Sequence, residues 1–175
     1  VFGVGGNDEL IIDSSNGLLT VPTGIRYNGD GACFIEGAGH AADVGFDRGF
    51  DKLTLLQSAG DLQASETVAI GQLPGSGIST IAGPSGTQIV FFEELEPIVT
   101  AVPFTSFDVT ADAALASLLQ SDNHITYTSG AIVPSYGRIE VDGFEPIEFS
   151  NKTDLVINGR SGNDVFVLNN SALPT

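Results

Sequence analysis

The chain has 175 residues and carries 22 Asp and Glu residues against 6 Lys and Arg residues, which gives a formal net charge of −16. Nucleic-acid binding and attraction to an anionic membrane need clustered Lys and Arg side chains, so this balance argues against both partners. The 42% hydrophobic content argues against disorder, and no apolar run approaches the roughly 18 residues of a membrane-spanning helix, so we expect no membrane insertion.

The composition favours short β-strands joined by turns, because 22 Gly and 8 Pro residues accompany many Val, Ile, Thr and Phe residues. Apolar segments bounded by Gly, Pro, Asn or Asp recur along the whole chain. We predict strands at residues 9–13, 18–20, 25–27, 53–56, 67–70, 78–81, 88–92, 125–128, 138–141, 147–149, 155–157 and 165–168.

Two segments depart from this strand pattern. Residues 37–49 are rich in Gly, Ala and Asp and predict a long loop. Residues 110–120 contain good helix formers, with Leu115 and Leu119 on one face at helical spacing. We therefore predict one short helix there, with Thr110 or Asp112 as its N-cap.

The middle of the chain contains a short internal repeat. Pro84-Ser85 and Pro134-Ser135 are 134 − 84 = 50 residues apart. Glu96-Pro97-Ile98 and Glu145-Pro146-Ile147 are 145 − 96 = 49 residues apart. Both copies predict a strand, a turn, a second strand and then an apolar-Glu-Pro-Ile element.

The two ends of the chain carry the same motif. Gly3-Val4-Gly5-Gly6-Asn7-Asp8 precedes one apolar run, and Gly159-Arg160-Ser161-Gly162-Asn163-Asp164 precedes another, with an offset of 159 − 3 = 156. Glycine permits positive φ, and Asn and Asp can hydrogen-bond their own backbone, so each copy predicts a sharp turn followed by a strand. We interpret residues 1–175 as a single elongated β-repeat module, about one period of a longer tandem array.

These patterns predict an all-β fold. Recurring Gly/Asn/Asp turns before apolar strands favour a parallel β-solenoid, a β-helix-like repeat module in which similar turns stack, with one short helix. Short, closely spaced strands are also typical of a β-sandwich, which is the alternative.

Residues 155–166, 24–31 and 50–55, together with the apolar-Glu-Pro-Ile element, resemble recurring units of very large secreted bacterial surface proteins, the adhesin-like "β-strand repeat" proteins. The resemblance touches both ends and the middle of the chain. It implies a β-rich, extracellular, tandemly arrayed module with a structural or adhesive role. The motif is also similar to the calcium-binding RTX nonapeptide at Gly159, Gly162, Asp164 and Phe166, but no second nonapeptide follows either copy.

The turn aspartates are candidates for calcium binding, because Ca²⁺ takes about six to eight oxygen ligands from carboxylates and backbone carbonyls. The alternative is that these side chains only fix their turns. The candidate metal ligands are Asp43, Asp47 and Asp51 of one acidic run, and Asn7, Asp8, Asn163 and Asp164 of the two terminal motifs.

No catalytic motif flanks His40 or His124, so we do not expect an enzyme. We expect an extracellular or cell-surface structural module of a repetitive bacterial surface protein or filament, joined head to tail to copies of itself. The alternative is a calcium-stabilised adhesin repeat that binds surface glycans. The predicted self-association residues are Leu10, Ile11, Ile12, Val165, Phe166, Val167 and Leu168.

Overall fold

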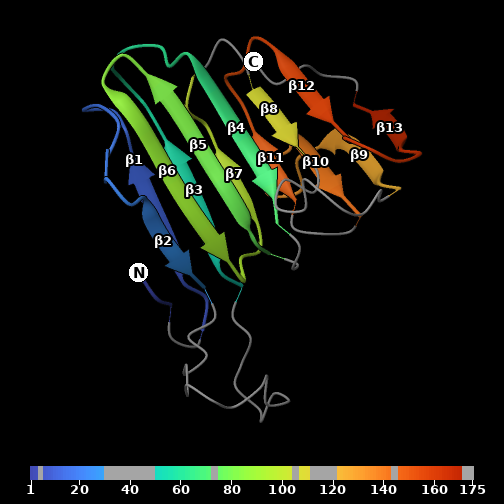
Figure 1. Ribbon diagram of the computed structural model, residues 1–175, viewed down its shortest axis with the longest axis horizontal. Coiled ribbons are helices and arrows are strands. Elements are labelled where there is room, and N and C mark those ends of the chain that lie inside the picture. Colours follow the sequence, from blue (N-terminus) through green and yellow to red (C-terminus); the bar gives the residue numbers. More distant parts are fainter. Residues whose placement is uncertain are drawn as a thin grey trace.

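The computed structural model describes residues 1–3, 6–29, 50–71, 75–103, 107–110, 122–142 and 146–170. These residues form β-strands in two mixed sheets, and none of them is helical (Figure 1). The all-β class predicted from the sequence is confirmed. The predicted loop at 37–49 lies outside the described residues, as do residues 111–120 of the predicted helix, and Thr110 is the last residue of a strand.

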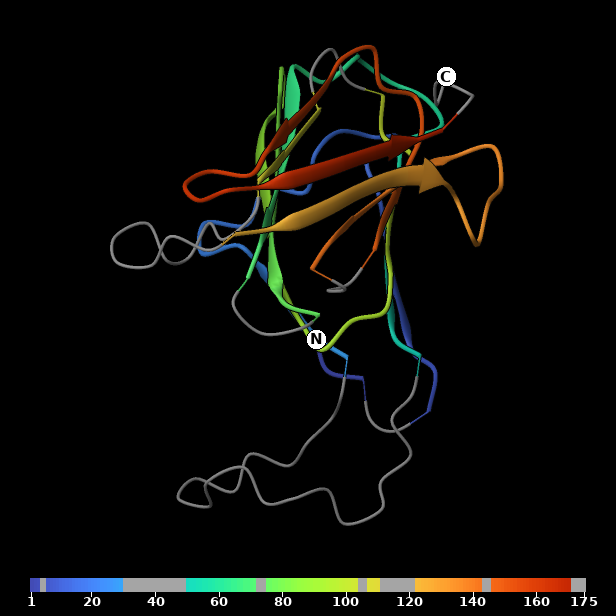
Figure 2. The ribbon, with the colours of Figure 1, turned by 90° about the vertical axis from the view of Figure 1, so that its right-hand side faces the viewer.

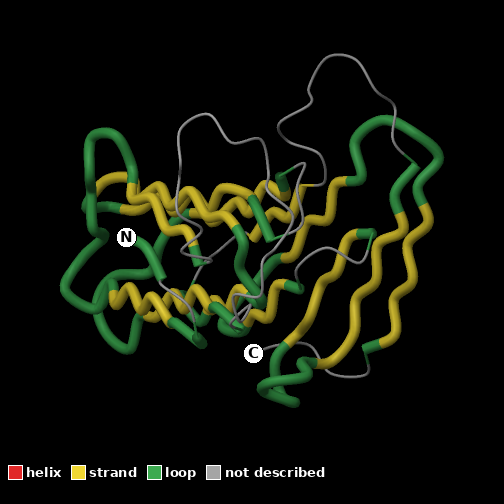
Figure 3. Tube along the Cα trace, turned by 90° about the horizontal axis from the view of Figure 1, so that it is seen from below, coloured by secondary structure: helices red, strands yellow, loops and turns green. Residues whose placement is uncertain are grey.

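The strands divide between a seven-stranded and a six-stranded sheet, which form two layers in Figure 3. In spatial order, the seven-stranded sheet contains β1 (Glu9–Asp13), β3 (Lys52–Leu56), β7 (Ile98–Thr100), β11 (Ile147–Phe149), β10 (Gly137–Val141), β9 (His124–Ser129) and β13 (Val165–Asn169). In spatial order, the six-stranded sheet contains β12 (Leu155–Asn158), β8 (Phe107–Thr110), β4 (Ser65–Ile70), β5 (Gly77–Gly83), β6 (Gly86–Glu93) and β2 (Ile25–Asn28).

Most neighbouring strands are parallel, but each sheet contains an antiparallel part. The antiparallel pairs are β4–β5 and β5–β6 in one sheet, and β9–β10 and β10–β11 in the other. The regular coils expected of a parallel β-solenoid are not detected among the described residues, because these hairpins interrupt both parallel stacks. Two packed sheets are compatible with the alternative expectation, a β-sandwich.

Side chains from both sheets share one hydrophobic core. Alternation along the strands supplies it: in β10, Ile139 and Val141 are buried while their neighbours Arg138 and Glu140 are only partly buried. Phe92 of the six-stranded sheet and Phe149 of the seven-stranded sheet are among the largest fully buried side chains, each stabilising the fold by about 2–3 kcal/mol. Phe149 also stacks on Tyr127, with ring centroids 6.0 Å apart.

Every predicted strand overlaps a strand of the structure except residues 18–20, where the prediction is wrong. The amides that a strand would need there are bound by side chains of the β5–β6 hairpin. Leu18 N–H donates to Ser85 Oγ at 3.1 Å, and Leu19 N–H donates to Gln88 Oε1 at 3.1 Å. Strands β7 and β8 were not predicted.

The two Glu-Pro-Ile copies lie side by side. Ile98 and Ile147 are register partners in the parallel pair β7–β11, and Ile98 N–H donates to the carbonyl of Pro146 at 3.1 Å. The internal repeat read from the sequence therefore corresponds to two stacked, in-register strands.

Candidate assembly sites at the two ends of the sheets

The two copies of the terminal motif lie at opposite ends of the molecule. The first copy leads into β1 and the second joins β12 to β13, and β1 and β13 are the two edge strands of the seven-stranded sheet. In Figure 1 the blue strands β1 and β2 lie on the left and the red strands β12 and β13 on the right. Residues 1–3 lie beside β2 through a parallel bridge between Phe2 and Asn28, whereas β12 is the opposite edge of that sheet.

The first motif copy is bonded to the turn that precedes β3. Phe50 N–H donates to Asn7 Oδ1 at 2.8 Å, and Asp8 N–H donates to Asp51 Oδ1 at 2.7 Å. Lys52 N–H donates to the carbonyl of Asp8 at 2.9 Å. The Asn and Asp side chains thus accept hydrogen bonds from turn amides that the strand ladder does not reach.

The second motif copy takes part in the same pattern of three hydrogen bonds, here with the turn that precedes β9. Asn163 N–H donates to Asp122 Oδ1 at 2.7 Å, and Asn123 N–H donates to Asp164 Oδ1 at 3.0 Å. Val165 N–H donates to the carbonyl of Asn123 at 2.8 Å. The three bonds match those at the other end, position for position.

The two motif copies occupy opposite sides of this shared bonding pattern. Asn7 accepts from the neighbouring turn through its side-chain oxygen, whereas Asn163 donates to its neighbouring turn through its backbone N–H and, at 3.4 Å, through its side-chain Nδ2. Asp8 donates through its backbone, whereas Asp164 accepts through its side chain. The same motif therefore supplies one side of the three-bond pattern at the first end and the opposite side at the second end.

The first glycine of each motif is buried against the aspartate five residues later. A Cβ on Gly3 would lie 2.8 Å from Asp8 Oδ2, and a Cβ on Gly159 would lie 2.5 Å from Asp164 Oδ2. The fourth residue of each copy is a glycine with positive φ, 108° and 134° respectively. These two requirements explain why the motif has glycine at both positions.

The predicted self-association residues lie on the two edge strands. All of β13 is exposed, with Val165 53%, Phe166 46%, Val167 41% and Leu168 69% accessible. Figure 2 faces this end and shows β13 beside β9. In β1, Leu10 is half-buried, Ile11 is exposed and Ile12 is buried. A row of exposed apolar side chains on an edge strand is typical of an interaction surface.

The predicted metal ligands are brought together only in part. Asn7, Asp8 and Asp51 meet at one end of the molecule, whereas Asn163 and Asp164 lie at the other end, and Asp43 and Asp47 lie outside the described residues. No group of three or more His, Cys, Asp or Glu side chains in the described ranges is placed to hold a metal ion. Calcium binding stays a prediction.

The carboxylates near β1 affect Tyr27, a buried residue of β2. Burial and, to a smaller extent, the carboxylates of Asp51, Asp8 and Glu9, which disfavour the phenolate, together raise the pKa of Tyr27 to about 12. The Tyr27 hydroxyl is buried and has no hydrogen-bond partner among the described residues. The phenol is therefore neutral at physiological pH.

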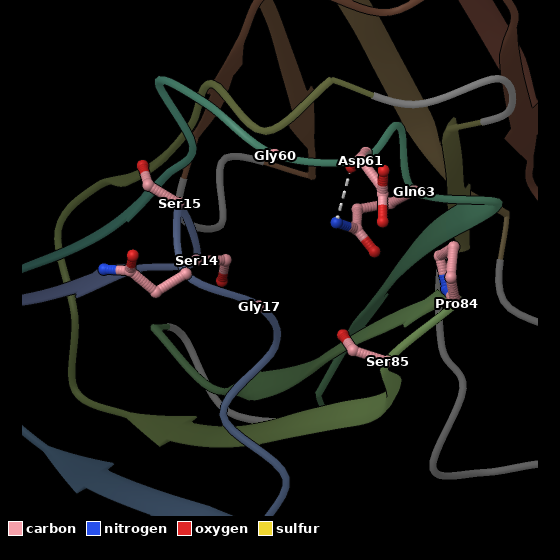
Figure 4. Close-up of a pocket in the computed structure, with 9 residues that line it drawn as sticks. Ser14, Ser15, Gly17, Gly60, Asp61, Gln63, Pro84 and Ser85 are labelled. Carbon is pink, nitrogen blue, oxygen red and sulfur yellow. Dashed lines mark hydrogen bonds between the residues drawn. The ribbon is translucent and has the colours of Figure 1, made fainter.

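A polar pocket of about 340 Å³ lies between three connections, away from both motif copies (Figure 4). Gln63 Nε2 donates to the carbonyl of Asp61 at 2.9 Å within it. Serine hydroxyls and one carboxylate occur there, and no histidine, lysine or cysteine is among the lining residues. The lining residues are Ser14, Ser15, Asn16, Gly17, Gly60, Asp61, Gln63, Pro84 and Ser85.

Comparison with protein-family models, with curated proteins and with solved structures found no match to this chain. Among the described residues there is no helix of the length and apolarity that crossing a membrane requires. The likeness to bacterial β-strand repeat proteins therefore rests on the sequence motifs alone.

Sequence reasoning did not single out Asp122 and Asn123, although they are the partners of the second motif copy in its three hydrogen bonds. The signal was an Asp-Asn pair one residue before the strand predicted at residues 125–128. It precedes Asn163 by 163 − 122 = 41 residues, close to the 50 − 7 = 43 residues that separate Asn7 from Phe50.

Proposed function

We propose that this chain is a structural module of a repetitive bacterial surface protein or filament, located outside the cell, in which successive copies are joined head to tail. The observation that carries the proposal is the placement of one motif at both ends of the molecule. Each copy leads into an edge strand of the seven-stranded sheet and is held to its neighbour by the same three hydrogen bonds.

The two ends provide what a head-to-tail joint needs. Each end presents an edge strand whose outer side no described strand covers, with exposed apolar side chains such as Phe166 and Leu168 at one end and Ile11 at the other. Strand pairing adds backbone hydrogen bonds and buries these side chains. Because the two surfaces differ, the contact is heterologous, and repeated copies extend into a fibre.

We further propose that the array is a flattened, solenoid-like fibre. The chain passes from one sheet to the other between β1, β2, β3 and β4, and successive passes become parallel neighbours, as in β1–β3 and β3–β7. The antiparallel hairpins are then insertions in the coils. An array whose modules each carry a formal charge of −16 also stays dispersed in water, because like-charged fibres repel each other.

The calcium-stabilised, glycan-binding adhesin repeat has less support from the described residues. At both joints the carboxylates of Asp51, Asp122 and Asp164 already accept hydrogen bonds from backbone amides. Calorimetric titration with Ca²⁺ and a glycan array test this alternative, which needs saturable binding in at least one of the two assays.

Electron microscopy of polypeptides with one, two and four tandem copies tests the proposed function. We expect stiff rods whose length grows in proportion to the number of copies, with or without a calcium chelator. Compact particles joined by flexible linkers would contradict it. Brief protease treatment of intact source cells, followed by detection of the released repeats, tests the extracellular location.

A further inference from the structure

The edge strands β1 and β13 leave different backbone edges open. In β1, the carbonyl of Asp8 accepts from Lys52 N–H, and Ser14 N–H donates to the carbonyl of Leu56. Successive residues of a strand direct their backbone groups to alternate sides. Even-numbered residues of β1 therefore face β3, and odd-numbered residues face the edge that no described strand covers.

In β13 the arrangement is reversed. Val165 N–H donates to the carbonyl of Asn123, so odd-numbered residues face β9 and even-numbered residues face the uncovered edge. With the offset of 159 − 3 = 156, Phe166 corresponds to Leu10 and Leu168 to Ile12. The residues that bind β3 in β1 are thus the counterparts of the residues left open in β13, and the converse holds for the odd-numbered residues.

The turns before these strands are complementary in the same sense. Asn7 and Asp8 make the contacts toward a following strand, and Asn163 and Asp164 make the contacts toward a preceding strand. The contacts described for the two copies do not overlap. A single motif can therefore make both sets of contacts at once.

The two edges of the six-stranded sheet also correspond through the 156-residue offset. Phe2, which bridges to Asn28 of β2, corresponds by the 156-residue offset to Asn158, the last residue of β12. If β13 doubles as a first strand, the seven-stranded sheet contributes 7 − 1 = 6 strands per period. The other sheet also contributes six. Each copy then adds six strands to both sheets, and equal numbers are needed if both sheets continue from copy to copy.

We infer that residues 157–170 form the first strand segments of the following copy, so that consecutive copies share them and recur every 156 residues. The partner is a second copy of this chain: β13 stays paired to β9 and takes the place of β1 against the following copy's β3, and β12 lies beside the following copy's β2. This joint specifies, and rests on, the head-to-tail function proposed above.

The shared strand fits the core of the following copy. Phe166 and Leu168 lie on the same face as their register partners Ile125 and Tyr127, both of which are buried. Across the joint they occupy the positions of Leu10 and Ile12, next to Leu53 and Leu55.

The contacts of the Glu9 side chain are not reproduced at the shared strand. Val165 stands where Glu9 pairs with Lys52 at 2.8 Å and accepts a hydrogen bond from Thr54 Oγ1, so both interactions are absent from the joint. Both side chains of that pair are partly exposed, so its loss has a small effect on stability.

The test compares two tandem polypeptides built from the full chain. In the first, residues 20–175 follow residue 175 directly, so that residues 157–175 serve both copies. In the second, two complete copies of residues 1–175 are joined. Amide hydrogen exchange is measured by NMR on a segmentally labelled first copy, with Val165 and Val167 as internal references because they already face β9.

We expect the amides of Phe166 and Leu168 to exchange about 100-fold more slowly in the first tandem than in the single chain, and to be unchanged in the second. Fast exchange in the first tandem overturns strand sharing. Equal slowing in both tandems overturns it too, because β13 would then pair with the edge of β1 instead of replacing it.

These two results are distinguishable from failure of the proposed function. If the amides contradict strand sharing and the tandem copies still form stiff rods, the head-to-tail function stands with a different joint. If neither tandem forms rods, the proposed function and the shared strand both fail.

Discussion

Lys152 Nζ lies 3.0 Å from Glu66 Oε2, although the two residues are 86 positions apart and their side chains are only 1% and 0% exposed. The ammonium also donates to the carbonyl of Val102 at 2.6 Å and to Thr100 Oγ1 at 3.2 Å. Glu66 belongs to β4 and Thr100 to β7, so this buried cluster connects the two sheets.

Removing one partner of this pair leaves a buried charge without its counter-ion. We expect Lys152→Met to lower the free energy of unfolding by about 3–5 kcal/mol, measured by urea denaturation. The double variant Lys152→Met/Glu66→Gln should recover most of this loss, since Gln still accepts from Thr100 and carries no charge. A single-variant loss below about 1 kcal/mol would show that the cluster does not hold the sheets together.

The same lysine makes stability depend on pH. Burial, partly offset by the charge and hydrogen bond of Glu66, lowers the pKa of Lys152 from its usual 10.5 to about 8. Between these two values the unfolded chain binds a proton that the folded chain does not, so the contribution of Lys152 to the free energy of unfolding rises with pH. Denaturation of the wild type and of Lys152→Met at intervals from pH 7 to 10.5 isolates this contribution as their difference. A difference that falls with pH would contradict the assignment.

Strand positions were largely predictable from the sequence, because a strand depends on local alternation and on flanking turn residues. Residues 165–168 and 138–141 are examples, and both are strands in the structure. The partition into two sheets was not predictable, because it depends on distant pairs such as Ile25 with Val90. The strand predicted at residues 18–20 was wrong for the same reason, since the amides of Leu18 and Leu19 bind side chains about 70 residues away.

The terminal motif was predictable as a turn, whereas its hydrogen-bond partners were not. Asp51 was expected from the sequence as a metal ligand, and in the structure its Oδ1 accepts from the backbone of Asp8. Asp122 was not expected at all, because its role depends on a strand pairing of β9 with β13 that no local pattern indicates.

The motif glycine tests the turn geometry directly. In Gly159→Ala, the new Cβ would lie 2.5 Å from Asp164 Oδ2, so the carboxylate must move and weaken its bond from Asn123 N–H. We expect a loss of about 1–3 kcal/mol in the free energy of unfolding, measured by chemical denaturation. Ser161→Ala, at an exposed position of the same turn, is the control and should stay within about 0.5 kcal/mol of wild type.

The exposed face of β13 tests the joint. Phe166→Asp places a charge on the edge strand, whereas Ile132→Asp changes a residue of similar exposure, 44% against 46%, in the β9–β10 turn. We expect Phe166→Asp to abolish rod formation by tandem polypeptides and Ile132→Asp to leave it intact, as judged by electron microscopy. Equal effects of the two substitutions on rod formation would contradict the proposal that β13 forms the joint.

Salt should affect end-to-end association of separate chains. Each chain carries a formal charge of −16, so two copies repel each other at low ionic strength. We expect sedimentation velocity to show more association at about 0.5 M NaCl than at about 0.02 M NaCl. Association that weakens with added salt would indicate that charge pairs, and not β-strand pairing and apolar burial, hold the joint.

The axial repeat of a tandem array with 156-residue spacing tests the central claim most directly. Strands in a sheet are about 4.8 Å apart, so six strands per copy in each sheet predict a rise of about 29 Å per copy in cryo-electron microscopy. A rise of about 34 Å or more, or a chain of separate particles without a regular repeat, would contradict the shared strand.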